Sequence, residues 1–305
     1  MKENWIILEG GLGNRMRVAA SAYAMARQLA RSGTECPIRV LWLSQWGMRC
    51  RFDELFKAPP RGGREEAFLR DATGFEKILF ARPTAKNLHL PRLLQRLRYR
   101  HIIYAPQIWH LNRDGFDYEA WFRQGDTLMT AYRDFCPWTP DDLHHLFRPT
   151  AEVQRLIDER CKDFTPHTIG LHIRRTDHQQ AIEESPLELF FAAVDKEMQE
   201  CEKGPSGIAI YLATDDEATK QALRSRYGSR VITSPAEATR DCTDGIREAL
   251  VEMYALSRTR HIYGSAGSTF SPIAACLGDV PITILQRDGQ GAVDLFCHTH
   301  YAMMS

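Results

Sequence analysis

The chain lacks the features of a membrane-spanning or disulfide-bonded protein. No stretch of its 305 residues approaches the roughly 18 consecutive apolar residues of a transmembrane helix, and the apolar run at the N-terminus is too short for a signal peptide. Its eight cysteines are scattered, and no two have C-x-x-C spacing. Scattered thiols are typical of reduced, mostly buried residues. We therefore expect a cytoplasmic protein, at most peripheral on a membrane.

Signatures of metal and nucleotide sites are missing or incomplete. Cys297, His298 and His300 cluster near the C-terminus, but no second ligand pair accompanies them, so we expect no metal site. The phosphate-binding pattern G-x-x-x-x-G-K-[ST] is absent. The dinucleotide pattern G-x-G-x-x-G is incomplete, because Met16 occupies its third glycine position. The sequence also contains no internal repeat and no low-complexity stretch.

The net charge of zero hides an asymmetry between the two halves of the chain. Residues 1–150 carry 23 Lys and Arg against 16 Asp and Glu, and residues 151–305 carry the reverse. Three prolines, at positions 137, 140 and 149, punctuate the same region. The composition is globular, with 44% hydrophobic and 26% charged residues, and the length allows two cores. We therefore predict a domain boundary near residue 150.

One segment of the first half contains no acidic residue. Between Glu76 and Asp114 the charged side chains are all basic: Lys77, Arg82, Lys86, Arg92, Arg96, Arg98, Arg100 and Arg113. Residues 77–113 are a candidate for contact with an anionic acceptor or a membrane surface. A solvated helix face is the more common explanation of such a run. A nucleic-acid interface is disfavoured by the neutral overall charge and the absence of binding motifs.

The first half opens with a strand, a glycine loop and a helix. The strand is predicted at 4–9 and the helix at about 16–31. In the loop G-G-L-G-N-R between them, Gly11, Gly13 and Asn14 would let a ligand approach backbone N–H groups at a helix N-terminus. A tight turn that packs strand against helix is the alternative. Further strands are predicted at 38–43, 102–105 and 127–132.

The second half shows a regular alternation of strands and helices, which predicts a parallel sheet. Strands are expected at 168–173, 208–213, 230–233, 261–263 and 281–285, and helices near 151–161, 187–200, 217–226, 244–257 and 272–276. Three polar loops then fall at the carboxyl edge, where such sheets bind ligands. They are R-R-T-D at 174–177, T-D-D-E at 214–217 and G-S-A-G-S-T-F-S at 264–271.

The stretch 168–177, T-I-G-L-H-I-R-R-T-D, runs from a buried strand directly into two arginines. Arg174 and Arg175 are permanent planar cations whose donor geometry matches phosphate oxygens. Alternation along the strand places His172 with Arg174 on one face and Arg175 on the other. The three loops together suit a nucleoside diphosphate. Ion pairs between these arginines and nearby carboxylates are the alternative.

The other two loops also have structural explanations. Thr214 and Glu217 have the spacing of a capping box, so that the second loop would simply start a helix. Ser271 before Pro272 is a normal N-cap followed by proline at the first helical position.

The three loops resemble the motifs of GDP-fucose-dependent fucosyltransferases. H-I-R-R-T-D at 172–177, I-Y-L-A-T-D-D at 210–216, and the region from A-L-S at 255–257 to G-S-T-F-S at 267–271 follow the order found in the α-1,6-fucosyltransferases, including the bacterial nodulation enzymes. The loop G-G-L-G-N-R is similar to the start of bacterial α-1,2-fucosyltransferases. The likeness covers residues 168–277 and the first thirty.

The resemblance implies an α/β protein of GT-B architecture, with two Rossmann-like domains facing across a cleft. Residues 1–150 would hold the acceptor, and residues 151–305 would bind the nucleotide sugar. It implies an inverting, metal-independent transfer of fucose from GDP-fucose to a hydroxyl of a glycan or glycoconjugate, without a cofactor. A GT-B transferase using another nucleotide sugar is one alternative. A non-catalytic protein that binds a nucleotide or carbohydrate is the other.

The resemblance also assigns roles to residues of the donor site. Arg174 would hold the diphosphate, Arg175 would support it, and His172 would lie against the nucleotide. Glu252 occupies the position of a family aspartate that contacts guanine. Two hydroxyl residues, Ser268 and Thr269, would reach the phosphates.

Acidic residues and one histidine complete the predicted catalytic set. Asp215 and Asp216 fill the family's paired carboxylates, and Asp215 is a catalytic candidate. Negative charge develops on the departing diphosphate oxygen, so Arg174 is the first candidate for the catalytic cation. The family lysine after R-R-T-D is replaced by His178, and the family's next acidic position falls on Ile182, beside two glutamates. The candidate bases for the acceptor hydroxyl are therefore His178, Glu183 and Glu184.

Overall fold

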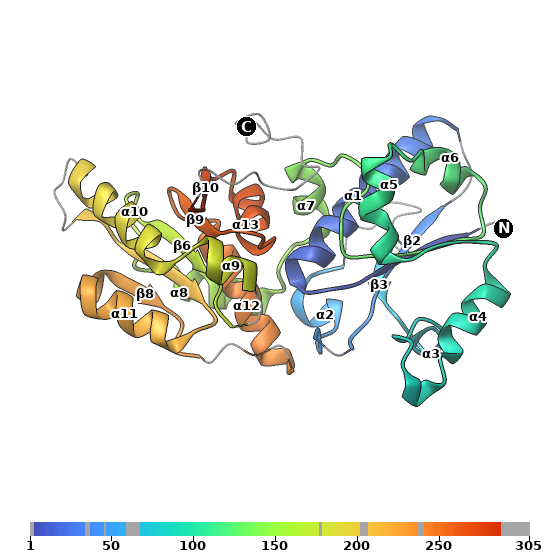
Figure 1. Cartoon of the computed structure of the whole chain (residues 1–305), viewed down its shortest axis with the longest axis horizontal. Helices are drawn as coiled ribbons and strands as arrows, with labels where there is room; N and C mark the ends of the chain where they lie inside the picture. The colour runs from blue at the N-terminus through green and yellow to red at the C-terminus, as the bar shows by residue number, and fades with distance from the viewer. Residues whose placement is uncertain are drawn as a thin grey trace. The chain divides into compact units, whose positions relative to one another are not determined.

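The structure is a computed structural model. It describes residues 3–33, 37–45, 47–58, 68–176, 179–201, 207–236, 239 and 241–287. These residues form two compact units. Unit 1 comprises the described parts of Met1–Thr150 and Asp241–Thr243, and unit 2 those of Ala151–Arg240 and of the chain from Asp244 onward. Each unit contains a five-stranded parallel sheet with helices packed around it (Figure 1).

The sheet of unit 1 has the strand order β3-β2-β1-β5-β4. Its strands are β1 (Asn4–Leu8), β2 (Ile38–Trp42), β3 (Leu69–Asp71), β4 (His101–Ile103) and β5 (Thr127–Ala131), and every pairing is parallel. The central strand β1 and its neighbour β5 are buried along their whole length, as expected for strands covered on both faces.

The helices of unit 1 are α1 (Leu12–Arg31), α2 (Phe52–Leu55), α3 (Glu76–Leu79), α4 (Leu90–Arg98), α5 (Ile108–Arg113), α6 (Tyr118–Arg123) and α7 (Pro140–Leu146), with 3-10 turns η2 (Ala85–Asn87) and η3 (Ala105–Gln107). Three fully buried alanines, at positions 19, 20 and 22, let α1 pack closely into the core. The predicted helix start at Met16 is four residues late. The N–H of Arg15 already donates to the carbonyl of Gly11 at 3.0 Å, so the glycine segment forms the first turn.

The sheet of unit 2 has the order β10-β9-β6-β7-β8. Its strands are β6 (Ile169–Ile173), β7 (Ile210–Thr214), β8 (Val231–Thr233), β9 (Ile262–Ser265) and β10 (Ile282–Leu285), again all parallel. Its helices are α8 (Ala151–Arg160), α9 (Gln179–Glu184), α10 (Leu187–Glu200), α11 (Glu217–Tyr227), α12 (Thr243–Leu256) and α13 (Phe270–Gly278), with the 3-10 turn η5 (Gly228–Arg230). Buried apolar residues of β6 and β7 pack against Phe190 and Val194 of α10.

The predicted α/β class with parallel sheets is confirmed in both units. Each predicted strand of the second half lies within two residues of an observed one. Among the described residues, no helix is long and apolar enough to cross a membrane. The six cysteines described are all free thiols, of which Cys50, Cys136 and Cys276 are buried.

Candidate functional site

Asp215 centres a hydrogen-bond network at the carboxyl ends of β6 and β7. These neighbouring strands are in register as far as Ile173 and Thr214, so the next residues, Arg174 and Asp215, meet directly beyond them. An Nη1–Oδ2 distance of 2.8 Å makes Arg174 and Asp215 an ion pair, with side-chain exposures of 17% and 8%. Asp215 Oδ1 accepts the Arg175 backbone N–H at 2.8 Å. The Thr176 hydroxyl and N–H donate to Oδ2 at 2.8 and 3.4 Å.

These donors determine the ionisation of Asp215. Burial by itself would raise the pKa of its carboxyl, but the Arg174 cation and the donors of Thr176 and Arg175 outweigh burial and lower the pKa below its ordinary value. Asp215 is therefore ionised at neutral pH. The structure thus contains an ion pair between Arg174 and a carboxylate, which the sequence offered as the alternative to binding a diphosphate. The same pair orients the guanidinium at the tip of a central strand, which reduces the rotamer entropy that binding an anion would cost.

Arg175 makes a different set of contacts. Its guanidinium donates to the carbonyl oxygens of Ser185 at 2.8 Å and Ile182 at 3.4 Å, at the end of α9. Burial lowers the pKa of Arg175, and the carboxylates of Asp216 and Glu188 partly offset that effect. Arg175 therefore fastens the end of α9 to the end of β6, which is a structural contribution to the site.

His172 is buried and connects β6 to the start of α13. Its ring stacks on Phe270, with centroids 4.8 Å apart and planes at 22°, and its Nδ1 lies 3.2 Å from the Ser271 hydroxyl oxygen. Burial lowers the pKa of His172 to about 3, and the Arg174 cation lowers it as well. The imidazole is therefore neutral. A side chain at Gly264 would clash with Ser271, so this glycine permits the close packing of β9 on α13.

The predicted N-cap at Ser271 is wrong, because α13 begins at Phe270 and its N-cap residue is Thr269. Gly267 has a φ of +68°, a backbone conformation that favours glycine at this turn. Ser268 and Thr269 are half-buried directly after it, and the Ser268 hydroxyl accepts the Phe270 N–H at 3.4 Å. Both predicted phosphate-binding hydroxyls therefore lie at the N-terminus of α13.

Two serines that the sequence analysis missed brace this loop. The Ser265 hydroxyl donates to the His172 carbonyl at 3.3 Å and accepts the Arg174 N–H at 3.1 Å. The Ser185 hydroxyl donates to the Leu285 carbonyl at 2.6 Å and accepts the Ala266 N–H at 2.8 Å. Ser265 could have been found, because it follows the strand predicted at 261–263 in a polar loop. Ser185 carried no such signal.

Asp216 caps a helix. Its carboxylate accepts from the N–H and the hydroxyl of Thr219 at 2.7 and 2.6 Å, and α11 begins at the next residue. The predicted capping box starting at Thr214 is wrong, because Thr214 is the buried last residue of β7. The two predicted paired carboxylates therefore have different local functions. Asp215 binds the R-R-T loop, and Asp216 starts the helix.

Glu252 projects from α12 with its ionisation displaced. Burial raises the pKa of its carboxyl to about 8, and the neighbouring Glu248 carboxylate adds to this effect, while Arg160 and Lys220 oppose it. Glu248 is itself paired with Arg160 at 2.6 Å. At neutral pH the Glu252 carboxyl is therefore mostly protonated. Both of its oxygens become hydrogen-bond acceptors only when the pH rises above the pKa of about 8.

The candidate bases on α9 differ in their surroundings. Glu183 is exposed, and its Oε1 accepts from the Gln179 amide at 2.7 Å. Glu184 is half-buried, and its Oε2 accepts from the Gln286 amide at 2.8 Å. The remaining candidate, His178, lies outside the described residues.

The glycine loop of unit 1 forms the entry to α1. Gly10 has a φ of +79°, and a Cβ there would come within 2.8 Å of the Asn14 amide nitrogen, so the position requires glycine. Gly11 is the N-cap residue, with extended backbone, and Gly13 and Asn14 lie in the first turn. The loop therefore directs the N–H groups of a 20-residue helix toward the carboxyl edge of the sheet.

Two charged residues beside this loop were not predicted as site residues. Arg15 is 1% exposed, donates to the carbonyl of Leu43 at 2.8 Å, and lies 4.9 Å above the Trp42 ring. Burial lowers the pKa of Arg15 to about 9. Glu9 directly follows β1, and burial raises the pKa of its carboxyl, while a hydrogen bond from Thr130 opposes that shift. The signal for Glu9 was a charge directly after a buried strand, whereas Arg15 is the basic residue that ends the loop G-G-L-G-N-R.

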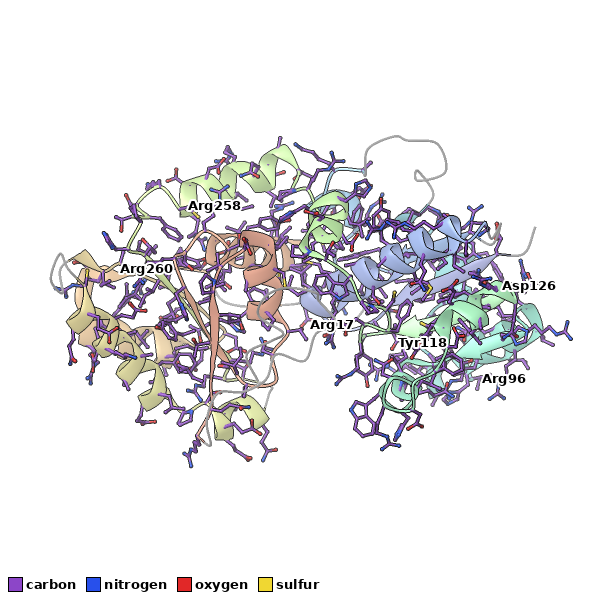
Figure 2. All side chains as sticks on the ribbon, turned by 90° about the horizontal axis from the view of Figure 1, so that it is seen from above. Arg17, Arg96, Tyr118, Asp126, Arg258 and Arg260 are labelled. Carbon is purple, nitrogen blue, oxygen red and sulfur yellow. The ribbon has the colours of Figure 1, made fainter. Side chains whose placement is uncertain are left out.

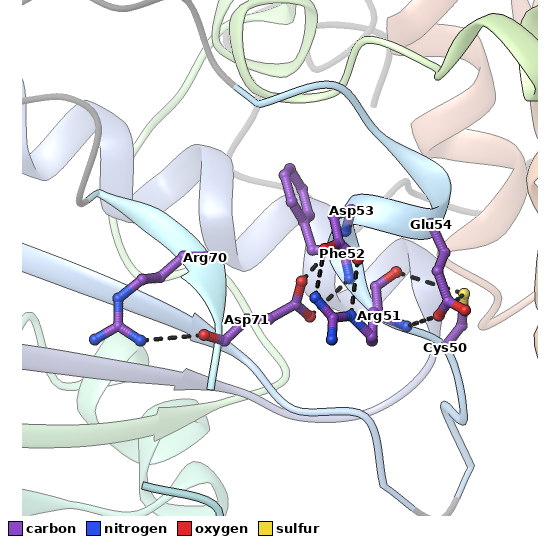
Figure 3. A network of polar contacts seen from close by, with 7 residues as sticks. All are labelled: Cys50, Arg51, Phe52, Asp53, Glu54, Arg70 and Asp71. Carbon is purple, nitrogen blue, oxygen red and sulfur yellow. Dashed lines mark hydrogen bonds and ion pairs between the residues drawn. The ribbon is translucent and has the colours of Figure 1, made fainter. Parts of the chain in front are cut away.

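Asp71, at the end of β3, has a structural function at the same edge (Figure 3). Its Oδ1 accepts the Phe52 N–H at 2.8 Å, and its Oδ2 accepts the Asp53 N–H at 3.3 Å, which caps α2. Arg51 pairs with Asp53 beside it. Burial raises the pKa of Asp71, and these backbone donors oppose the rise.

In the part of the chain that the structure describes, no three His, Cys, Asp or Glu side chains are grouped to hold a metal ion. The predicted cluster of Cys297, His298 and His300 lies outside the described residues.

No protein-family model matches the chain, and no curated protein matches its sequence. Solved structures match over most of its length. NodZ α-1,6-fucosyltransferase soaked with GDP-fucose is 18% identical, with 95% of this chain and 97% of that chain covered and a TM-score of 0.62; NodZ has also been solved from Bradyrhizobium. A variant of Arabidopsis thaliana FUT1 with GDP is 17% identical, with coverages of 92% and 70% and a TM-score of 0.55.

POFUT1 in complex with GDP is a more distant match, at 10% identity with coverages of 93% and 98% and a TM-score of 0.51. Such low identities establish the fold rather than the activity. The predicted resemblance is therefore confirmed at the level of the fold: the chain shares the two-sheet GT-B fold of these fucosyltransferase structures.

Proposed function

We propose that the chain is a glycosyltransferase that moves fucose from GDP-fucose to a hydroxyl of a glycan or glycoconjugate, with inversion and without a metal. The observation that carries the proposal is the position of Arg174 at the tip of β6, paired with Asp215. This is the edge at which parallel α/β sheets bind ligands. The fold shared with transferases solved with GDP or GDP-fucose supports the same conclusion.

In this proposal unit 2 binds the donor. Arg174 contacts the diphosphate, and the Ser268 and Thr269 hydroxyls with the N–H groups of the α13 start add donors to its oxygens. Glu252 accepts the guanine N–H groups when its carboxyl is ionised, and burial moves that ionisation to a higher pH. His172 acts as a positioning residue, because its ring is stacked on Phe270 and holds the start of α13 in place.

The reaction requires charge stabilisation and one proton acceptor. The acceptor oxygen forms a bond to the anomeric carbon of fucose while the bond from that carbon to the diphosphate oxygen breaks. Negative charge grows on the departing GDP, and the fixed Arg174 cation stabilises it more in the transition state than in the ground state. Asp215 positions Arg174, and Arg175 keeps the end of α9 in place.

We assign the acceptor to unit 1 and add Glu9 to the candidate bases Glu183, Glu184 and His178. Glu9 stands at the carboxyl edge of the unit 1 sheet, beside the loop of Gly11, Gly13 and Asn14. A carboxyl whose pKa is raised toward neutrality is a more effective general base than one at its ordinary value. In this role its carboxylate takes the proton of the acceptor hydroxyl.

The test is a melting screen against GDP, UDP, ADP and their sugar conjugates, followed by a transfer assay with and without EDTA. We expect stabilisation by GDP and GDP-fucose, and transfer that EDTA does not reduce. A preference for UDP or ADP would indicate another donor. GDP binding without hydrolysis or transfer over hours would indicate a non-catalytic binding protein.

A further inference from the structure

The segment from Phe75 to Leu97 exposes an unusual amount of apolar surface. Nine large hydrophobic side chains are exposed among the described residues, and six of them fall in this segment: Phe75, Ile78, Leu88, Leu90, Leu93 and Leu97. Leu88 is 87% exposed and Leu97 is 78% exposed. Isolated exposed leucines are ordinary, but a group of this kind marks an interaction surface. We call these six residues the apolar patch.

The apolar patch belongs to one projection of unit 1. Helices α3 and α4 contact each other and project from the edge of the unit (Figure 1). Leu90, Leu93 and Leu97 are three and four residues apart and therefore share one face of α4. A different face holds α4 on the unit, because Gln95 is buried and Leu94 packs against the core. The leucine face is thus different from the face of α4 that packs against the core of unit 1.

Cations border the apolar patch. Arg92 and Arg96 lie on the face of α4 beside the leucines, and Lys77 and Lys86 lie on α3 and η2; all four are exposed. The Arg92 guanidinium rests 5.0 Å above the ring of Tyr104. The sequence has no acidic residue at 77–113, although the Glu9 carboxyl outside this run interacts with Arg92.

A cavity opens beside the cationic face of α4. Its volume is about 410 Å³, and its lining is Arg96, Tyr99, Arg100, Ile102, Tyr104 and Gln107. The Arg96 side chain lies at the surface of unit 1 (Figure 2). Two guanidinium groups and a glutamine amide offer the hydrogen-bond donors that a phosphate group requires.

We propose that the α3–α4 projection docks unit 1 onto an anionic lipid bilayer. The apolar patch enters the interface between headgroups and acyl chains, and the bordering cations bind lipid phosphates. One of these phosphates binds in the cavity that Arg96 lines. An exposed apolar face flanked by Lys and Arg is the pattern of helices that lie in a membrane surface. Anionic lipid is the proposed partner because its charge complements that of the bordering cations. Docking of this kind does not depend on which nucleotide sugar the protein uses.

Vesicle flotation tests the proposal on the full chain. We expect the protein to float with phosphatidylcholine vesicles that contain about 30% phosphatidylglycerol, whose negative surface potential attracts Lys and Arg. It should float much less with pure phosphatidylcholine or in high salt. Leu93→Ser with Leu97→Ser should lower the partition coefficient by roughly tenfold per leucine. Lys77→Gln with Arg96→Gln should lower it by about fivefold per cation for anionic vesicles.

A charge-matched control uses two exposed cations elsewhere, Arg31→Gln with Arg155→Gln. We expect this variant to float like the parent protein, and all three variants to keep the parental Tm and stabilisation by GDP. Absence of flotation with anionic vesicles would overturn the proposal, as would equal losses in the control. Conversion of a dimer to a monomer by the leucine variant, without vesicle binding, would assign the patch to self-association and also overturn it. None of these outcomes affects donor binding, which separates this test from that of the transferase activity.

Discussion

At the carboxyl edges of the two sheets, the pKa values of the acidic groups are shifted in opposite directions. In unit 2, Asp215 is surrounded by donors that lower the pKa of its carboxyl, so both partners of the Arg174 pair stay charged. In unit 1, Glu9 is half-buried where burial raises the pKa of its carboxyl despite the nearby cations. The first edge is a site of fixed charge, and the second contains a group that can exchange a proton.

This contrast matches the two tasks of a glycosyl transfer. Binding a diphosphate requires charges that do not depend on pH and that are oriented before the ligand arrives. Accepting a hydroxyl proton requires a group whose pKa lies nearer the working pH. Removing one group at a time tests this division.

Arg174→Ala should have the largest effect. Loss of the fixed cation should lower kcat by several hundredfold, because one such donor contributes about 3–4 kcal/mol to the transition state. Arg175→Ala is the matched control, since its guanidinium binds backbone carbonyls of Ser185 and Ile182. The control should lower Tm and leave kcat within about tenfold. Near-normal turnover of Arg174→Ala would remove the main support for the proposed function.

Glu9→Gln should lower kcat by roughly 10²-fold, the lower range for loss of a general base. In the parent protein kcat should fall as pH decreases through the pKa of Glu9, and the variant should lack this acid limb. A raised folded-state pKa means that the ionised carboxyl costs stability at neutral pH, so the variant should also melt higher. An unchanged pH profile would return the role to Glu183, Glu184 or His178.

Asp215→Asn should weaken both stability and transfer by about 2 kcal/mol, or roughly 30-fold in kcat/KM, because it removes the carboxylate that orients Arg174. The lowered folded-state pKa of Asp215 contributes stability above its unfolded pKa, and this contribution is lost as pH falls through the folded value. The Tm difference between parent and variant should therefore shrink under acid conditions. A difference that is constant with pH would contradict the assignment.

Glu252→Gln should have the smallest effect, seen only in the pH dependence of donor binding. If guanine binds the carboxylate, the affinity for GDP-fucose should fall by about tenfold per pH unit below the pKa of about 8. Calorimetry between pH 6.5 and 8.5 measures this slope. The variant should bind as the protonated parent does at the acid end of this range and should show no slope. A slope identical to that of the parent would exclude Glu252 from the guanine site.

Much of the second half was predictable because its strands are buried apolar runs separated by polar loops. The central strand before Arg174 and the order of the three loops followed from local pattern alone. Short elements were missed: β3 has three residues and no alternation, and α9 is supported by its contacts with Arg175 rather than by its own sequence. Helix starts were displaced at α1 and α13 because glycine and polar loop residues took part in the first turns.

The sequence by itself determined which residues arrive at each carboxyl edge, because strand burial and chain order are local properties. Only the tertiary structure decided what each polar group does there. Alignment of β6 with β7 paired Arg174 with Asp215, whereas Arg175 and Asp216 became structural contacts. Burial left His172 neutral and Glu252 protonated, whereas the Arg174 cation and nearby donors kept the buried Asp215 ionised. These differences arise from the surrounding dielectric and from partners distant in sequence, which no local pattern encodes.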